Sequence, residues 1–362
     1  MAKKDKTISF IERMEMDNLD PDWNIPCEFP DLTGYKEIAV DLETRDPNLT
    51  TLGPGWARGD GNIVGIAVAA GDYSGYFPIR HQNGHNLDPK VTLRWFKKQM
   101  ATPRIDKIMH NATYDAGWLH AEGIEVQGRI IDTMVAAPLI DENRFSYSLN
   151  NLGRDWIDMR KNEKMLRAAA KDFGFDPKSE MWRLPPMYVG AYAEQDAIMT
   201  LKLWHRLKIE ISEQDLGAIF DLETGLIPLM LEMRKKGVRV DLDKADQART
   251  ALRKQVKTLK GFIDYKSGVK IEPWAAESVK KVFEALDLSY PRTEAGAPSF
   301  TKQYLSSHPS DVAQAIVKLR EFDKADGTFI ETIQRHSHKG RIHCEFHQLR
   351  SDDGGTVTGR FS

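Results

Sequence analysis

Apolar and polar positions divide the first half of the chain into short strands and intervening helices. Apolar runs predict five strands, at residues 37–43, 62–70, 73–79, 107–109 and 129–131. Short connections between the first three strands predict an antiparallel meander. Helical spacing at 91–100 and 112–122 then alternates with the later strands. The pattern therefore predicts a mixed α/β sheet.

The second half of the chain has mainly helical spacing, beginning at about residue 148. Long helices are predicted at 188–210, 221–236 and 244–263, and a Pro/Gly/Thr-rich stretch at 291–299 separates further helical segments. The first 35 residues are polar and are interrupted by prolines, which is typical of a loosely structured lead-in. We expect three parts: a lead-in at 1–35, an α/β domain at 36–217, and a mainly helical region at 218–362.

Composition excludes several classes of protein. A length of 362 residues predicts two or three domains. No run of about 18 apolar residues occurs, which argues against a membrane span, and the charged N-terminus does not resemble a secretory leader. The two cysteines, Cys27 and Cys344, are too few for a disulfide framework or a cysteine-based zinc site. These features predict a cytoplasmic protein.

Charge is distributed unevenly along a chain whose formal net charge is −2. Residues 231–362 carry 24 basic and 18 acidic side chains, whereas residues 1–230 carry 27 basic and 35 acidic ones. A basic region favours a polyanionic partner such as nucleic acid, and an acidic region favours a domain that gathers carboxylates around metal ions. The offset is mild support for both interpretations.

Carboxylates recur at spacings that place them on shared faces. Each pair is two apart on a predicted strand or four apart on a predicted helix: Asp41 with Glu43, Asn111 with Asp115, and Tyr192 with Asp196. Taken singly, such pairs are usually a solvated strand edge, a helix cap or a surface pair. If the three faces converge, they form a pocket of four carboxylates with a phenol beside them.

Four neighbouring carboxylates repel one another unless cations neutralise them. Hard divalent ions with oxygen ligands do this best, which indicates Mg²⁺ or Mn²⁺. Two such ions can support in-line attack of water on a phosphodiester. Tyr192 would orient that water, since an ordinary tyrosine pKa of about 10 argues against its acting as the base.

Three segments resemble the exonuclease motifs of the DEDDy 3′→5′ exonucleases, whose fold is RNase H-like: residues 40–44 (VDLET), 110–115 (HNATYD) and 192–200 (YAEQDAIMT). The resemblance implies that Asp41, Glu43, Asp115 and Asp196 bind two divalent cations and that Tyr192 positions the water. It also implies that Thr44 and Asn111 contact the 3′-terminal nucleotide. Asp132 and Thr133 match another recurrent feature of the family, although we expect them to act as a helix cap.

The C-terminal region resembles the thumb and the beginning of the palm of family A DNA polymerases, through residues 222–241, 291–301, 341–343 and 356–362. In that family Arg360 would lie near the primer–template duplex. The resemblance implies the proofreading 3′→5′ exonuclease part of a replicative phage or bacterial polymerase, located in the cytoplasm (the host's, if phage-encoded). It would release 5′-mononucleotides from single-stranded or frayed 3′ DNA ends.

The sequence stops at Ser362, where the family continues into palm and fingers, so we expect no polymerase active site and a palm-and-fingers fragment as partner. It would be the N-terminal part of a split polymerase, a truncated fragment, or an exonuclease with a vestigial thumb. Two alternatives stay open: a non-catalytic DNA-binding or assembly half of a split polymerase, and an RNase D-like RNA exonuclease.

Two further groups of residues have a functional and an ordinary interpretation. Basic residues of the helical region would face phosphates, or simply form a solvated surface: Lys254, Lys257, Lys260, Lys318 and Arg320. Tyr114 and Trp118 could stack on a frayed base, but their spacing of four on a helix favours the core.

Overall fold

A computed structural model describes residues 22–352 and 354–362, which form two compact units. One unit runs to Lys236 and also includes Cys344–Ser362, and the other is Gly237–His343. The expected lead-in at 1–35 falls partly outside the described residues, and its described part, 22–35, contains no helix or strand.

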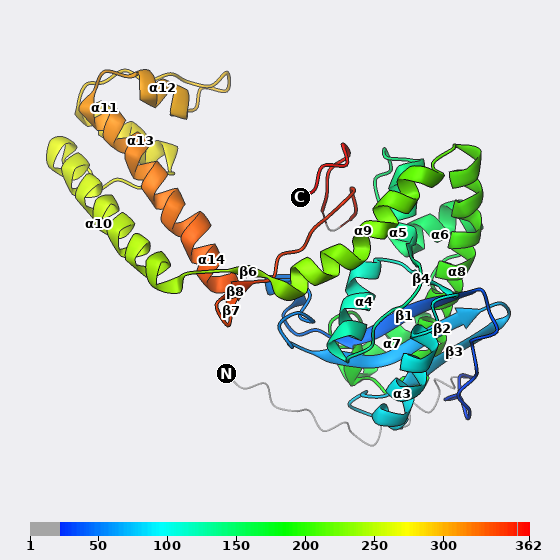
Figure 1. Ribbon diagram of the computed structural model, residues 1–362. Helices are drawn as coiled ribbons and strands as arrows, with labels where there is room; N and C mark the ends of the chain where they lie inside the picture. The colour runs from blue at the N-terminus through cyan, green and yellow to red at the C-terminus, as the bar shows by residue number, and fades with distance from the viewer. Residues whose placement is uncertain (1–21, 353) are drawn as a thin grey trace. The chain divides into compact units, whose positions relative to one another are not determined.

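The first unit is built on a mixed five-stranded sheet in the order β3-β2-β1-β4-β5 (Figure 1). Its strands are β1 (Glu37–Arg45), β2 (Asn62–Ala70), β3 (Tyr73–Pro78), β4 (Asp106–Met109) and β5 (Ile130–Asp132). β1, β2 and β3 pair antiparallel, whereas β4 and β5 continue the sheet in parallel with β1. The predicted meander and mixed sheet are confirmed.

Helices cover both faces of this sheet, so its central strands are buried on both sides. The helices are α2 (Leu49–Leu52), α3 (Pro89–Met100), α4 (Ala112–Ala121), α5 (Thr133–Ile140), α6 (Leu149–Ile157), α7 (Lys164–Phe173), α8 (Gly190–Glu213) and α9 (Gly217–Lys236). Two short 3₁₀ turns, η1 (Met181–Arg183) and η2 (Pro186–Tyr188), precede α8. This coverage explains why β2 reads as a continuous apolar run instead of an alternating one.

Alternation along β1 separates two hydrophobic clusters. Ile38, Val40 and Leu42 pack in a cluster with side chains of α3, α4 and α9. Ala39 belongs to the opposite cluster, which side chains of α5 to α8 complete. Because successive side chains of a strand point to opposite faces, Asp41 and Glu43 lie on the Ala39 face, toward α8.

One buried charge supports the connection that follows α3. Lys107 on β4 is fully buried, and its ammonium donates hydrogen bonds to the carbonyl oxygens of Thr102 at 2.5 Å, Ile105 at 2.9 Å and Gln127 at 2.5 Å. An ammonium has three donors, so all three are satisfied by backbone carbonyls.

The domain boundary lies later than the expected position at 217. α9 belongs to the first unit because Phe220, Ile227 and Met230 bury their side chains in that unit's two clusters. The segment Cys344–Ser362 also packs on this unit, where Gln348 Nε2 donates to the backbone oxygen of Glu223 at 2.8 Å. The sequence pattern marks the change from mixed to helical structure but does not show where a helix packs.

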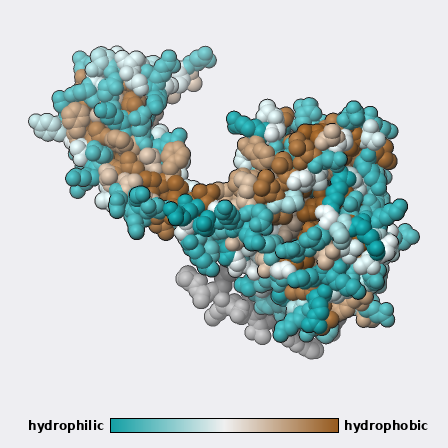
Figure 2. Space-filling view, in the orientation of Figure 1, coloured by the Kyte–Doolittle hydropathy of each residue, from teal (hydrophilic) through white to brown (hydrophobic). Residues whose placement is uncertain are grey.

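The outer face of α9 carries exposed apolar side chains. Ile219, Leu222, Leu229 and Met233 are between 37% and 59% exposed, and Figure 2 shows hydrophobic residues gathered along this helix. Their spacing of three, seven and four residues places them along one stripe. None of the described helices is long and apolar enough to span a membrane.

The second unit is mainly helical, as predicted. Its elements are β6 (Val238–Arg239), α10 (Leu242–Ser267), α11 (Ala276–Ala285), α12 (Lys302–Ser307), α13 (Asp311–Lys324), the π-helix η3 (Ala325–Ile330), α14 (Glu331–His336), β7 (Ser337–His338) and β8 (Arg341–Ile342). The short strands form a sheet in the order β6-β8-β7. Asp241 caps α10 by accepting a hydrogen bond from the backbone N–H of Lys244 at 3.0 Å.

Arg320 does not belong to a phosphate-facing surface of this unit. Its guanidinium donates to the carbonyl oxygens of Pro273 and Phe300, each at 2.7 Å, and so braces two loops. Lys254, Lys257 and Lys318 are exposed. The lysines therefore remain available to a polyanion, whereas Arg320 has a structural role.

Candidate exonuclease site

Asp41 and Glu43 lie near the end of β1 on the face covered by α8. Across the antiparallel pairing, Asp41 is opposite Ala67 and Glu43 is opposite Gly65, both of which are small. A bulge in the pairing between Glu43 and Thr44 follows directly. Asp41 and Glu43 are partly exposed in a strand whose apolar residues are buried, and the Tyr76 ring fills the space over Gly65.

Asp115 comes to the same place from α4. It is 4% exposed, and its carboxylate lies near the backbone of Leu42, between Asp41 and Glu43. The helix that carries it begins at Asn111, which has a left-handed backbone with φ of 69°. Asparagine tolerates this conformation better than most side chains.

Asp132 fixes where that helix begins. Its carboxylate accepts hydrogen bonds from the backbone N–H groups of Asn111 at 3.0 Å and Ala112 at 2.7 Å, and from Met134 at 2.8 Å. The last of these caps α5, so the predicted cap is confirmed, and the same side chain also holds the start of α4. The second function could not be read from the sequence because it joins segments twenty residues apart.

Tyr192 and Asp196 share one face of α8, as their spacing predicts. Asp196 is 2% exposed, and the Tyr192 side chain lies close enough to affect the pKa of its carboxylate. One carboxylate oxygen, Oδ2, accepts from the Lys161 ammonium at 2.6 Å. The other, Oδ1, is buried without a hydrogen-bond partner among the described residues.

Burial and neighbouring carboxylates raise the pKa values of the acidic side chains at this site. Burial raises the pKa of Asp41 to about 7, and the Asp196 carboxylate adds to the effect. Burial, with the Asp41 charge next, also raises the pKa of Glu43 and of Asp115 well above their ordinary values. Such mutual repulsion indicates a site that favours bound cations.

Lys161 is a member of the site that the sequence did not reveal. It lies in the loop between α6 and α7, and its ammonium is 3.3 Å from the Tyr192 hydroxyl as well as bonded to Asp196. Burial opposes its charge, but the carboxylates of Asp196 and Asp41 outweigh this and raise the pKa of Lys161. No spacing rule connects it to the motifs, because it belongs to no regular element.

The donor set fits divalent metal ions. All four acidic side chains offer oxygen atoms, which hard cations prefer, and Asp196 keeps one buried oxygen unpaired. Within residues 22–352 and 354–362, no three acidic, histidine or cysteine side chains are already arranged around one point as metal ligands. The Asp196 oxygen Oδ2 is engaged by the Lys161 ammonium.

The three residues expected to contact the substrate lie in different surroundings. The Thr44 hydroxyl shares a hydrogen bond of 2.7 Å with the hydroxyl of Tyr114, and Asn111 Oδ1 accepts one from Thr113 at 3.3 Å. Arg360 is exposed on the C-terminal segment of the same unit. Trp118 is 1% exposed, which confirms its place in the core.

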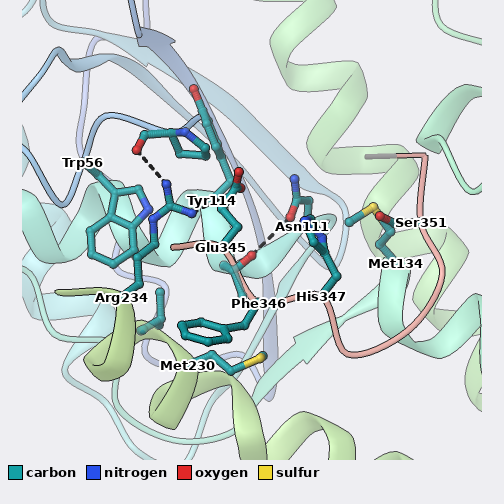
Figure 3. Close-up of a pocket in the computed structure, with 13 residues that line it drawn as sticks. Trp56, Asn111, Tyr114, Met134, Met230, Arg234, Glu345, Phe346, His347 and Ser351 are labelled. Atoms are coloured by element: carbon teal, nitrogen blue, oxygen red, sulfur yellow. Dashed lines mark hydrogen bonds and ion pairs between the residues drawn. The ribbon is translucent and has the colours of Figure 1, made fainter. Parts of the chain in front are cut away.

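Two pockets are lined by candidate site residues, one by Asn111 and the other by Tyr192, and they differ in size. Figure 3 shows the first, which Asn111 and Tyr114 line together with Arg234, Glu345 and His347. Its volume is about 40 Å³, and one water needs roughly 10–15 Å³, so it admits a few waters but no nucleotide.

The second pocket lies beside Tyr192 and measures about 460 Å³. Trp23, Met165, Met187 and Gln195 line it along with Tyr192. Pockets of ~300–1,000 Å³ accept small organic ligands, so this one is large enough for a nucleotide.

Comparison with known proteins identifies the domain. The family model of the 3′-5′ exonuclease domain of DNA polymerase A matches residues 29–212. A DNA-directed DNA polymerase of Pseudomonas phage M6 is 35% identical over 98% of this chain and 56% of its own length. DNA polymerase I of Treponema pallidum is 26% identical over 70% of this chain and 25% of its own length.

A solved structure shares the fold. The POL domain of Pol1 from M. smegmatis superposes with a TM-score of 0.70 at 18% identity, covering 94% of this chain and 54% of that one. The chain also spans only about half the length of its phage relatives. The RNase H-like fold class is confirmed, and the chain belongs to the family of 3′-5′ exonuclease domains of family A DNA polymerases.

Proposed function

We propose that this chain hydrolyses the 3′-terminal phosphodiester of DNA with the help of divalent cations, releasing 5′-mononucleotides, and that it is the proofreading part of a family A polymerase. The observation that carries the proposal is that Asp41 and Glu43 lie on the face of β1 that α8 covers, and that Asp196 is buried on α8 with one carboxylate oxygen unpaired among the described residues. A structural role for these residues does not explain why like charges gather from three elements.

The four carboxylates would hold two Mg²⁺ or Mn²⁺ ions, which supply the charge that activates the attacking water and stabilises the leaving 3′ oxygen. The surrounding residues orient these groups. The backbone of Leu42 lies beside Asp115, and the Lys161 ammonium bonds Asp196 at 2.6 Å. Burial, with the Asp196 charge next, raises the pKa of Tyr192, so its hydroxyl stays protonated and orients water instead of removing a proton.

The substrate is proposed to be a single-stranded or frayed 3′ end. A base of such an end is free to enter the pocket of about 460 Å³ beside Tyr192, where Trp23 and Met187 offer apolar contacts. A paired base would first have to leave the stack, which costs a few kcal/mol and favours mismatched ends.

The test is degradation of a 5′-labelled single-stranded DNA in Mg²⁺, followed as a ladder on a gel. We expect shortening from the 3′ end that a chelator abolishes, and a loss of at least about 100-fold in Asp41→Ala and Asp196→Ala. Asp172→Ala is the matched control, because Asp172 is exposed on α7, and it should keep wild-type activity. Wild-type activity in Asp41→Ala would reject the site.

The same assay separates the alternatives. Faster shortening of a matching RNA would favour an RNase D-like enzyme. Intact DNA, bound but never shortened in Mg²⁺ or Mn²⁺, would favour a non-catalytic DNA-binding half.

A palm-and-fingers part is the partner that we infer. Two observations support it: the phage relatives are nearly twice as long as this chain, and α9 carries an exposed apolar stripe that includes Leu222 and Leu229. We expect no primer extension by this chain alone with deoxynucleotides and Mg²⁺. Robust extension would contradict the proposed division of activities.

A further inference from the structure

Lys161 is the residue of the exonuclease site whose role is least explained by the motifs. Its ammonium contacts Asp196 and the Tyr192 hydroxyl and lies 5.3 Å from the centre of the Tyr192 ring. Its side chain is 18% exposed. A single cation therefore touches two of the five residues that the motifs bring to the site.

The position of Lys161 is fixed by its neighbours along the chain. The backbone N–H of Lys161 donates to Asn150 Oδ1 on α6 at 3.0 Å. On α8, Gln195 accepts from the N–H of Asn162 at 2.6 Å and donates to the carbonyl of Arg160 at 3.0 Å. Gln195 directly precedes Asp196, so the loop is tied on both sides of Lys161 to the helix that bears the carboxylate. A surface lysine that met Asp196 by chance would not need this framework.

Formal charge suggests what the ammonium does once cations are present. Two divalent ions balance the four carboxylates, which leaves the charge of Lys161 in excess. A phosphodiester carries one negative charge, which equals that excess. A divalent cation bound at Asp196 neutralises the negative charge that holds the ammonium, so cation binding weakens the ion pair and frees the ammonium.

On the basis of the proposed function, we propose that Lys161 is a substrate-binding residue, whose ammonium is held by Asp196 in the cation-free chain and contacts a phosphate of the single-stranded 3′ end when divalent cations occupy the carboxylates. The lysine also competes with the cation for Asp196. These two roles predict effects of opposite sign when Lys161 loses its charge.

The variants for the test are Lys161→Met, Lys161→Arg and Lys164→Met. Lys164 is exposed at the start of α7, so its replacement removes the same charge from the same segment without touching Asp196. The measurements are Mn²⁺ binding to the DNA-free chain by calorimetry, and binding of a fluorescein-labelled oligothymidylate in Ca²⁺ by anisotropy at several salt concentrations.

We expect Lys161→Met to bind Mn²⁺ several-fold more tightly and the DNA about 5–10-fold more weakly. The slope of log K against log salt should fall by about 0.7, the value for one lost phosphate contact on a single strand. Lys164→Met should change neither quantity, and Lys161→Arg should restore most of the DNA affinity. This restoration also excludes misfolding as the cause of the loss.

Wild-type DNA affinity in Lys161→Met would overturn the proposal, and so would weaker Mn²⁺ binding. The failure of the proposed function is distinguishable, because the wild-type chain would then leave the DNA unshortened in Mg²⁺ and in Mn²⁺, whatever its affinity for the DNA.

Discussion

Acidification below neutral pH should destabilise the first unit through His81. This imidazole is 5% exposed and lies between two fixed partners: its Nδ1 is 2.8 Å from the carbonyl oxygen of Leu184, and its Nε2 is 2.6 Å from the Tyr76 hydroxyl. A carbonyl only accepts, so Nδ1 carries the proton and Nε2 accepts from Tyr76. These two hydrogen bonds therefore stabilise the neutral form of the His81 imidazole.

The size of the effect follows from the pKa. Burial lowers the pKa of His81 from an ordinary 6.5 to about 4, and one pKa unit corresponds to about 1.4 kcal/mol, so the full effect is about 3 kcal/mol. Because the pKa is lower in the folded chain, this stability is complete above pH 6.5 and is lost as the pH falls toward 4. By pH 5 the loss should reach about 2 kcal/mol.

Urea unfolding at pH 7 and pH 5, followed by tryptophan fluorescence, measures this loss. Of the eight tryptophans, Trp274 alone lies in the second unit, so the signal reports mainly on the first. His81→Gln keeps an acceptor for Tyr76 but cannot titrate, so its stability should change with pH by about 2 kcal/mol less than that of the wild type. His85→Gln, at an exposed histidine, should retain the wild-type dependence. Identical pH dependence in His81→Gln and wild type would refute the reasoning.

Three further substitutions test parts of the fold that position the site. Lys107→Met should lower the free energy of unfolding by about 2–4 kcal/mol in urea titrations, because three buried carbonyls lose their donor. Asp132→Asn should cost about 2 kcal/mol and also lower the exonuclease rate in the gel assay, since it loosens the start of the helix that bears Asp115. Gly117→Ala should cost about 1–3 kcal/mol in thermal unfolding, because an added Cβ would lie 2.3 Å from the Trp56 ring.

Each of these substitutions has a control or a contradicting result. Lys98→Met, at an exposed lysine of α3, should be close to neutral. For Asp132→Asn, a loss of stability with an unchanged rate would show that the start of α4 does not control the site. Gly225→Ala adds the same methyl group on α9 with no atom within 4 Å, and should be neutral or stabilising by up to about 1 kcal/mol. Equal losses in the two alanine variants would contradict the packing argument.

The sequence predicts the site well where local periodicity determines direction. Strand alternation alone places Asp41 and Glu43 on one face, and helical spacing joins Tyr192 to Asp196, which the structure bears out. Prediction from the sequence fails where tertiary contacts determine the partners of a side chain. Arg320 has the same local pattern as the exposed Lys318, yet two carbonyls from distant loops engage it.

The boundary between the units is a failure of the same kind. The helical pattern changes near 217, but α9 packs on the first unit through side chains such as Phe220 and Ile227. Lys161 lies in a loop and acquires its neighbours only when α6 and α8 come together, so no periodicity points to it.

The double attachment of Asp132 makes one part of the chain tolerant of length changes. The residues between the end of α4 and the start of β5, 122–129, do not determine where α4 starts, because a side chain at the end of β5 does so from outside that connection. An insertion at an exposed residue of this connection, such as Glu125, can be absorbed at the surface while α4 keeps its register against the sheet. Homologous enzymes with longer or shorter turns at this point should therefore keep the carboxylate that corresponds to Asp115 in the same position beside β1.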